Sequence, residues 1–157
     1  HLAAKYDNAM FLGSLSKFYG LSGLRVGYLI TPLAYTEHFK NTIDVIEVSS
    51  LAILAGNIVM DDERYQKKTQ ENVLESMKIL QEACKGTTYQ LSATPHCFGA
   101  YLYSETRNPK KDLEAEGIKI LEGQYFGLPD SVSGGRFNLS NPKNAALAAE
   151  KIKKIHS

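Results

Sequence analysis

The stretch Gly13-Ser-Leu-Ser-Lys-Phe-Tyr-Gly-Leu-Ser-Gly-Leu-Arg-Val-Gly27 sets a lysine between hydroxyl groups and a glycine-rich turn, with an arginine eight residues further on. Short apolar runs lie on both sides of it, at Ala9–Leu12 and Arg25–Ile30, and each predicts a buried strand. Lys17 would lie at the end of one strand and Arg25 at the start of the next. Both side chains would then point into the same opening.

The residue types in this stretch suit a phosphate group and an amine. The hydroxyls of Ser14 and Ser16 can donate to phosphate oxygens, and the guanidinium of Arg25 can bind two such oxygens in parallel. Gly20 and Gly23 allow the backbone to pass close to a ligand. A P-loop is excluded because the lysine precedes its glycines, and the glycine spacing also differs from that of a dinucleotide site.

The same stretch resembles the lysine signature of class I and II aminotransferases, Ser-x-Ser-Lys-x-x-Gly-Leu-x-Gly-x-Arg-x-Gly. In that family the lysine forms a Schiff base with pyridoxal 5'-phosphate, while the first serine and the arginine hold the phosphate. The resemblance therefore implies that Lys17 is catalytic and that Ser14 and Arg25 bind the cofactor, with Ser16 as a weaker candidate. It also implies an amino acid and a 2-oxo acid as substrates. In the family the two strands around this stretch are neighbours, so the resemblance implies that they pair antiparallel.

A second candidate is the arginine in Gly134-Gly-Arg136-Phe-Asn-Leu-Ser140. By itself, an arginine at the start of a strand is read more readily as a surface charge. Members of the resembled family carry an arginine in a similar Gly-Arg-x-Asn-aliphatic context, where it binds the substrate α-carboxylate through a bidentate pair. The resemblance thus implies that Arg136 is the carboxylate clamp, and the upstream Gln124–Gly127 is similar to the family's loop in this region.

Composition excludes several other classes of function. The 157 residues include 18 basic and 17 acidic ones, for a formal charge of +1, so neither nucleic acid nor an anionic membrane is expected as a partner. No apolar stretch is long enough for a membrane span and no signal peptide is recognisable, so a cytoplasmic location is expected. Cys84 and Cys97 are expected as free thiols. Neither His96 nor Cys97 has metal-ligand spacing, so no metal site is expected.

In the first half of the chain, helices are expected after the two strands. Thr31 is expected to cap a helix that begins at Pro32 and runs to about Ile43. Residues 49–60 are apolar nearly all round, which predicts a helix packed closely between other elements. Arg64–Lys85 is periodic and amphipathic, and the following glycine ends it. Its expected buried face consists of Val73, Leu74, Met77, Leu80 and Ala83.

In the second half, a mixture of strands and helices is expected. Helices should start after Asn108 and Asn141, each followed by a proline, and the last one should bury Ala146, Leu147, Ala149, Ile152 and Ile155. Strands are expected at Tyr89–Ser92, Gly99–Tyr103, Ile118–Leu121 and Arg136–Leu139, with a loop over 123–133.

Taken together, the elements and the resemblance predict an α/β protein. Residues 1–62 would be the end of the fold-type-I aminotransferase large domain, 63–86 a linking helix and 87–157 the small α+β carboxyl-terminal domain. The chain lacks an initiator methionine, and the family's glycine-rich phosphate loop, stacking aromatic and ring-binding Asp and Tyr have no counterpart in it. We therefore expect the carboxyl-terminal part of a longer, homodimeric protein, inactive by itself and binding the cofactor weakly.

Several alternatives stay open at this point. The leading hypothesis is an aminotransferase of the aspartate or aromatic type. A histidinol-phosphate aminotransferase is a rival, although no second arginine beside Arg136 could receive a substrate phosphate unless Arg107 approaches from elsewhere. Decarboxylases, lyases and acyl-transferring synthases of the same fold also use the lysine signature. A non-catalytic remnant domain is the alternative of a different class.

Overall fold

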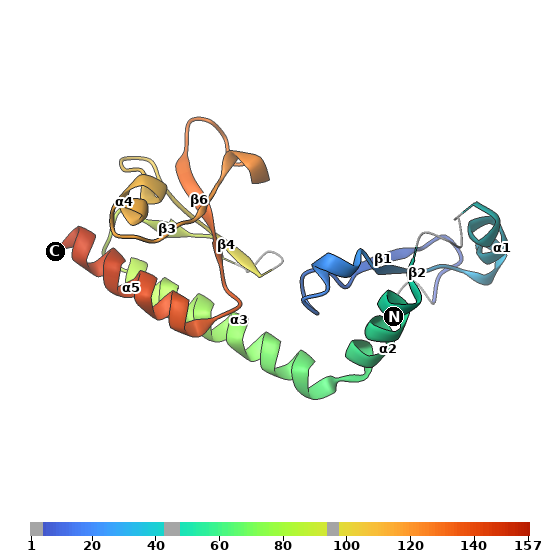
Figure 1. Ribbon diagram of the computed structural model, residues 1–157. Helices are drawn as coiled ribbons and strands as arrows, with labels where there is room; N and C mark the ends of the chain where they lie inside the picture. The colour runs from blue at the N-terminus through green and yellow to red at the C-terminus, as the bar shows by residue number, and fades with distance from the viewer. Residues whose placement is uncertain (1–4, 43–47, 94–97) are drawn as a thin grey trace. The chain divides into compact units, whose positions relative to one another are not determined.

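The computed structural model describes residues 5–42, 48–93 and 98–157, and the chain divides into two compact units. Unit 1 is His1–Gln66 and unit 2 is Lys67–Ser157. The boundary falls inside the long helix α3 (Glu63–Cys84), which contributes its first turn to unit 1 and the remainder to unit 2. Figure 1 labels the elements of both units.

In unit 1 the two leading strands form an antiparallel ribbon. β1 (Phe11–Ser14) pairs with β2 (Gly27–Ile30), and the register places Ser14 opposite Gly27, so the predicted pairing is confirmed. The backbones approach closely at this end because a Cβ on Gly27 would lie 2.6 Å from the carbonyl oxygen of Gly13. The other elements of the described part are the short 3-10 helix η2 (Ser22–Leu24), α1 (Leu33–Thr42) and α2 (Ser50–Asp61).

Three details of unit 1 differ from the prediction. β1 begins two residues later than expected, and Arg25 precedes β2 rather than starting it, in a left-handed conformation (φ 53°) that ends η2. Thr31 does not cap α1, since its Oγ1 is buried without a hydrogen-bond partner among the described residues. The carbonyl of Pro32 instead accepts from Tyr35 N at 3.0 Å. The expected last residue of this helix, Ile43, lies outside the described residues.

Helix α2 is capped by Ser49 but is not packed on all sides. The Ser49 hydroxyl accepts from Ala52 N at 3.2 Å. Ala52 and Gly56 are the buried residues of α2, whereas Leu54 is 58% exposed. The prediction of close packing all round is therefore wrong for this chain. The core of unit 1 is a cluster of Leu15, Val26 and Ala52 with partly buried neighbours.

Unit 2 combines an antiparallel sheet with three helices. The sheet order is β3 (Gln90–Leu91), β4 (Gly99–Ser104), β6 (Ser133–Asn138) and β5 (Leu121–Glu122). The other elements are α4 (Pro109–Ala115), the 3-10 helix η3 (Gln124–Phe126) and α5 (Pro142–His156). In Figure 1 the helices α3 and α5 lie on the same side of this sheet. Asn108 and Asn141 cap α4 and α5, as predicted.

The core of unit 2 lies between the sheet and the helices. Both long helices are turned slightly from their predicted faces: Leu74 and Leu147 are 65% and 51% exposed, and Ser76 is buried instead. The buried residues of α5 are mostly alanines, whose small side chains allow this helix to pack closely against the rest of the core. The buried apolar residues of the cluster are Val73, Met77, Leu80, Ala83, Tyr89, Ala100, Leu102, Leu113, Ile120, Phe137, Leu139, Ala145, Ala148, Ala149 and Ile152.

β6 begins three residues earlier than the predicted strand because two glycines belong to it. A Cβ on Gly134 would lie 2.5 Å from the carbonyl oxygen of Leu102, and one on Gly135 equally close to that of Leu121. The neighbouring strands thus leave room only for glycine at these positions. In the predicted strand Ile118–Leu121, only Leu121 is in β5, which continues to Glu122. The predicted loop over 123–133 contains η3 and the first residue of β6.

Candidate functional site

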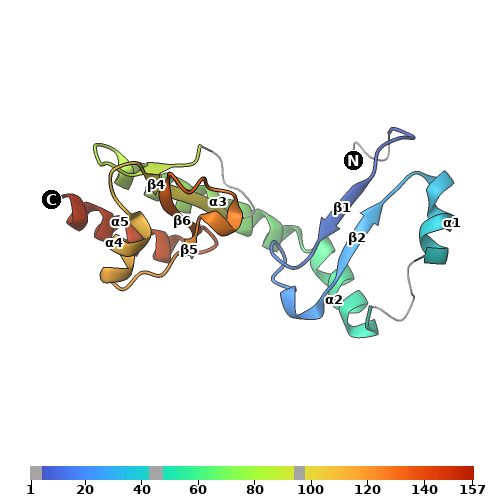
Figure 2. The same cartoon turned by 90° about the horizontal axis from the view of Figure 1, so that it is seen from above.

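The signature residues lie in the loop that joins β1 to β2, and this loop is closed at its neck. Leu15 N donates to Val26 O at 3.2 Å, and Leu21 N donates to Leu15 O at 3.1 Å. Leu15 and Val26 are buried and pack with Ala52 of α2. Figure 2 shows the loop end of the β1–β2 ribbon beside α2. Residues near both ends of the signature are therefore held together at the neck.

The hydroxyl and amine groups stand on the outside of this loop. Ser14 is exposed, and its Oγ accepts from Ser16 N at 3.2 Å, which leaves the hydroxyl proton available to donate. Lys17 is exposed and lies in the turn three residues after β1 rather than at its end. Its carbonyl accepts from Gly20 N at 3.2 Å, and Gly20 has a φ of 69°, which favours glycine.

Arg25 adopts a conformation that few residues with a side chain adopt. Its φ of 53° and ψ of 47° lie in the left-handed region. The side chain is exposed, and Nη1 donates to Ser22 O at 3.2 Å. This bond uses one of the N–H donors of the guanidinium and holds the Arg25 side chain against its own loop.

Aromatic side chains support the same loop, which the sequence reasoning did not foresee. The Tyr19 ring meets the edge of Phe18 at 4.9 Å and stacks on Tyr65 of α3 at 6.4 Å, measured between ring centroids. Burial, and then the neighbouring Tyr28, raise the pKa of the Tyr19 hydroxyl. Tyr19 therefore stays neutral at physiological pH and serves the loop by packing.

Arg136 belongs to unit 2, in the middle of the sheet. It lies in β6, opposite Tyr101 of β4 and Leu121 of β5, and is half-buried. Its Cζ lies 5.1 Å from the centre of the aromatic ring of Phe126, which is the last residue of η3. A Cβ on Gly99 would collide with the Arg136 guanidinium, so the arginine passes directly over this glycine.

Arg107, the possible phosphate contact of a histidinol-phosphate aminotransferase, forms its hydrogen bonds within unit 2. Its Nε donates to Asp112 Oδ2 at 3.0 Å and its Nη1 to Ile155 O at 3.4 Å. The hydroxyl of the buried Tyr89 donates to the same carboxylate oxygen at 2.5 Å. These contacts connect α4, the start of the sheet and the end of α5, and they give Arg107 a structural role.

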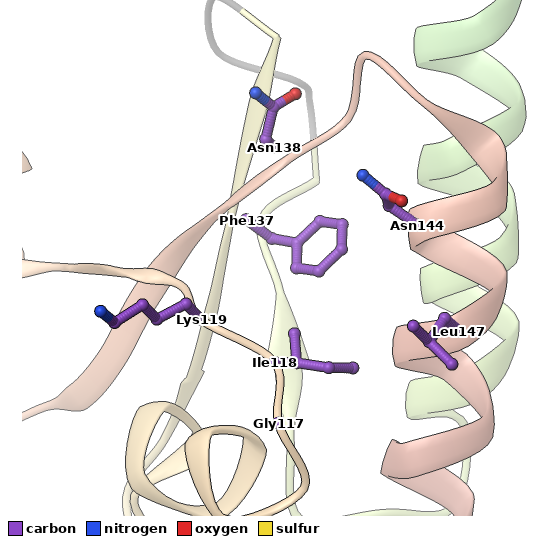
Figure 3. A pocket seen from close by; sticks show the side chains of 7 residues that line it. All are labelled: Gly117, Ile118, Lys119, Phe137, Asn138, Asn144 and Leu147. Carbon is purple, nitrogen blue, oxygen red and sulfur yellow. The ribbon is translucent and has the colours of Figure 1, made fainter.

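Each unit also has a shallow hollow of about 250 Å³, which in unit 1 lies beside the loop neck, where Leu15 and Val26 line it. In unit 2 it lies between β6 and α5, where Phe137 and Ile118 point toward Leu147 (Figure 3). The Lys119 amine points away from it. In unit 1 the hollow is lined mainly by apolar residues, including Val48 and Met60.

The residues that the structure describes contain neither a membrane-spanning helix nor a metal-binding cluster. None of the helices in the described ranges is long and apolar enough to cross a membrane. Within those ranges, no cluster of three or more His, Cys, Asp and Glu residues could hold a metal ion. Cys84 is a free thiol, while His96 and Cys97 lie outside the described residues.

Comparison with curated proteins finds relatives of a single kind among those most similar. The histidinol-phosphate aminotransferase of Campylobacter jejuni subsp. doylei is 32% identical over 129 residues, which are 81% of this chain and 35% of that protein. The protein of the same name from Haloferax volcanii is 29% identical over 134 residues, 83% of this chain and 36% of its own. The chain thus spans about a third of the length of the curated relatives it matches.

Solved structures share the fold. A histidinol-phosphate aminotransferase from Clostridium acetobutylicum matches with a TM-score of 0.78 and 20% identity, covering 96% of this chain and 46% of that one. An L-threonine-O-3-phosphate decarboxylase from Porphyromonas gingivalis matches with a TM-score of 0.72 and 19% identity, covering 98% and 48%. These matches confirm the predicted α/β fold of fold-type-I pyridoxal-phosphate enzymes. Residues 1–152 match the family described as aminotransferase class I and II, and the chain belongs to this family.

Proposed function

We propose that the protein containing this chain is a pyridoxal-phosphate-dependent aminotransferase that transfers an amino group between an amino acid and a 2-oxo acid through Lys17. The observation that carries the proposal is the single loop between β1 and β2. It closes at a hydrogen-bonded neck and leaves Ser14, Lys17 and Arg25 exposed. Family membership supports this activity for the whole protein.

Pyridoxal 5'-phosphate is the cofactor of this family, and two solved neighbours are described as PLP-bound. The donors of the loop fit its phosphate. Ser14 Oγ already accepts a hydrogen bond and retains its proton for an anion, and Arg25 commits Nη1 to Ser22 while its other N–H groups provide a charged fork. A Cβ on Gly23 would meet nothing within 4 Å, so the turn beside the arginine leaves open space.

The proposed roles follow from these side chains. When bound, the cofactor supplies an electron sink for the carbanion left by removal of the substrate Cα proton. Lys17 Nζ would take the substrate Cα proton as a base and then give a proton back as an acid. Ser14 and Arg25, with Ser16 as a weaker contributor, hold the phosphate and so fix the ring relative to Lys17. Arg136 binds the substrate α-carboxylate.

A narrower substrate is also proposed, namely histidinol phosphate. The most similar curated proteins found carry that name at 29–32% identity, which favours it over the aspartate or aromatic type. Arg107 does not supply the phosphate contact in this proposal, because Asp112 and the Ile155 carbonyl hold it. That contact would have to come from another part of the whole protein.

The domain assignment and the assembly are proposals as well. Unit 1 would be the end of the cofactor-binding large domain and unit 2 the small domain, with α3 linking the two. A homodimer and a cytoplasmic location are proposed for the longer protein on the strength of the family. Light scattering on the purified protein and fractionation of the source cells would test these two points.

The direct test uses a protein of the relatives' full length that contains this chain. Lys17→Ala should lower turnover with 2-oxoglutarate by at least about a thousandfold and abolish the absorbance of covalently attached cofactor, because the proton-transfer group and the attachment point are both lost. Histidinol phosphate, aspartate and an aromatic amino acid are compared as donors. Lys78→Ala, an exposed lysine of α3, is the matched control and should behave as the parent.

The outcomes are distinct. If Lys17→Ala keeps its activity and a borohydride-reducible cofactor adduct, the assignment of Lys17 is wrong. If aspartate or an aromatic amino acid gives the highest kcat/KM, the histidinol-phosphate proposal is wrong while the aminotransferase proposal stands. If the parent protein neither binds the cofactor nor turns over any donor, the alternative of a non-catalytic remnant is correct.

A further inference from the structure

The side chain of Arg136 packs against residues from two different segments of unit 2, η3 and β4. Its Cζ lies 5.1 Å from the centre of the Phe126 ring, within the range of a cation–π contact. Gly99 of β4 lies against the guanidinium, because any Cβ at this position would collide with it. The ring and the glycine therefore both define the space that the guanidinium occupies.

Phe126 is itself held by contacts of its backbone. The Tyr101 hydroxyl donates to Phe126 O at 3.1 Å, and Phe126 N donates to Gly123 O at 2.9 Å. Gly127 follows in the left-handed region with a φ of 89°, so the chain turns away immediately after the phenylalanine. The Phe126 side chain is nevertheless 41% exposed, which means that it contributes little to the core of unit 2.

From this arrangement we propose that Phe126 is a positioning residue, which orients the Arg136 guanidinium for bidentate binding of a carboxylate while Gly99 leaves the space that the guanidinium needs. The inference rests on the proposed function of Arg136. A long flexible side chain must adopt one planar orientation to form two parallel hydrogen bonds, and an aromatic face beneath it reduces the number of orientations available. The residue acts through Arg136 and does not itself contact the reacting atoms.

The first measurement is made on the 157-residue chain by nuclear magnetic resonance. The chain has four arginines, at positions 25, 64, 107 and 136, so their side-chain Nε–Hε signals can be assigned by substitution. Phe126→Leu should move the Arg136 signal toward the position of a solvated arginine and increase its mobility. Phe126→Tyr keeps an aromatic face and should restore the parent signal. Tyr125→Leu is the control, since this neighbour is 84% exposed.

The second measurement is steady-state kinetics in a protein of the relatives' full length that contains this chain. Phe126→Leu should raise KM for the amino acid about tenfold while changing kcat less than about threefold, as expected for a lost cation–π contact that acts on substrate binding. Phe126→Tyr should stay within about twofold of the parent. Gly99→Ala displaces the guanidinium without touching Phe126 and should raise KM likewise, so it decides the matter if Phe126→Leu fails to fold.

Arg136→Lys is measured in parallel to separate two kinds of failure. If Arg136→Lys raises KM strongly but both Phe126→Leu and Gly99→Ala leave KM unchanged, the positioning role is wrong and the carboxylate clamp stands. If Arg136→Lys also leaves KM unchanged, the proposed role of Arg136 is wrong and the inference falls with it. An Arg136 signal that does not respond to Phe126→Leu, or a KM that rises equally in Tyr125→Leu, would also overturn the inference.

Discussion

In unit 2, Leu80 and Leu102 are each 1% exposed, within a cluster that draws on three helices and the sheet. In the described part of unit 1, the buried apolar cluster consists of Leu15, Val26 and Ala52. Leu54, which lies on the same helix as Ala52, is 58% exposed. Burial of apolar surface is the main favourable contribution to folding. Unit 2 therefore has the larger internal source of stability.

The two units also differ in how they hold the side chains to which we propose functions. In unit 1 the loop with Lys17 is shaped by hydrogen bonds of its own backbone and by a few apolar contacts. In unit 2, Arg136 lies in the middle of a sheet, and the other face of this sheet packs against the large apolar core. We infer that Arg136 keeps its place in the isolated chain more firmly than Lys17 does.

The largest expected effect is on the folding of separate fragments. Residues 63–157, which keep α3 intact, should fold cooperatively, because the whole of the larger cluster lies within them. Residues 1–66 should show no cooperative unfolding transition, because their core is too small to offset the loss of chain entropy. Circular dichroism during urea titration and the dispersion of amide signals measure both. A sharp transition in the 1–66 fragment would contradict the comparison.

The next effect is that of a single cavity in the larger core. Leu80→Ala should lower the free energy of unfolding of unit 2 by about 2–5 kcal/mol, since Leu80 is 1% exposed and its removal leaves a void. Leu74→Ala, six residues earlier on the same helix and 65% exposed, should change it by less than about 0.5 kcal/mol. Urea unfolding of both variants gives the difference, and equal losses would show that α3 packs with the face that the sequence predicted.

The features that could be predicted from the sequence are those set by local patterns. The lysine signature has a fixed spacing and led to the family, and the apolar runs around it predicted the two strands, whose antiparallel pairing the resemblance implied. The caps at Asn108 and Asn141 also follow from a polar residue before a proline. Each of these depends on residues a few positions apart, so the chain carries its own signal for them.

Features that depend on distant partners could not be predicted in the same way. Glycines usually weaken strands, yet Gly134 lies in β6 because the backbone of β4 approaches it too closely for a Cβ. The contact of Phe126 with Arg136 joins residues whose sequence positions give no periodic signal. The left-handed conformation of Arg25 depends on how the loop closes. The exposure of α2 depends on which other segments pack against it.

A smaller effect concerns alkaline pH. Burial raises the pKa of the Cys84 thiol from its ordinary value of 9.0 to about 11, and burial together with the hydrogen bond to Asp112 raises the pKa of Tyr89. Because folding favours the neutral thiol, its contribution is fully present below about pH 9 and is lost as the pH rises toward 11. Stability of unit 2 should therefore fall over this range. Urea unfolding at several pH values should give a shallower fall for Cys84→Ala, with Tyr89→Phe testing the tyrosine separately.

The smallest expected effect on stability comes from the exposed face of α2. Leu51, Leu54 and Ile58 are 65%, 58% and 62% exposed. Leu54→Ser should leave the unfolding midpoint of unit 2 unchanged. It should also change the free energy of unfolding of the 157-residue chain by less than about 0.5 kcal/mol, because little surface is buried at this position.

The same substitution should nevertheless reduce self-association of the 157-residue chain, because an exposed apolar helix face promotes contacts between copies. Light scattering over a concentration series measures this, with Leu74→Ser on the exposed face of α3 as a control of equal chemistry. If Leu54→Ser instead lowered the stability of the chain by several kcal/mol, the face would be covered in solution. Unit 1 would then owe its order to a partner surface rather than to its own small cluster.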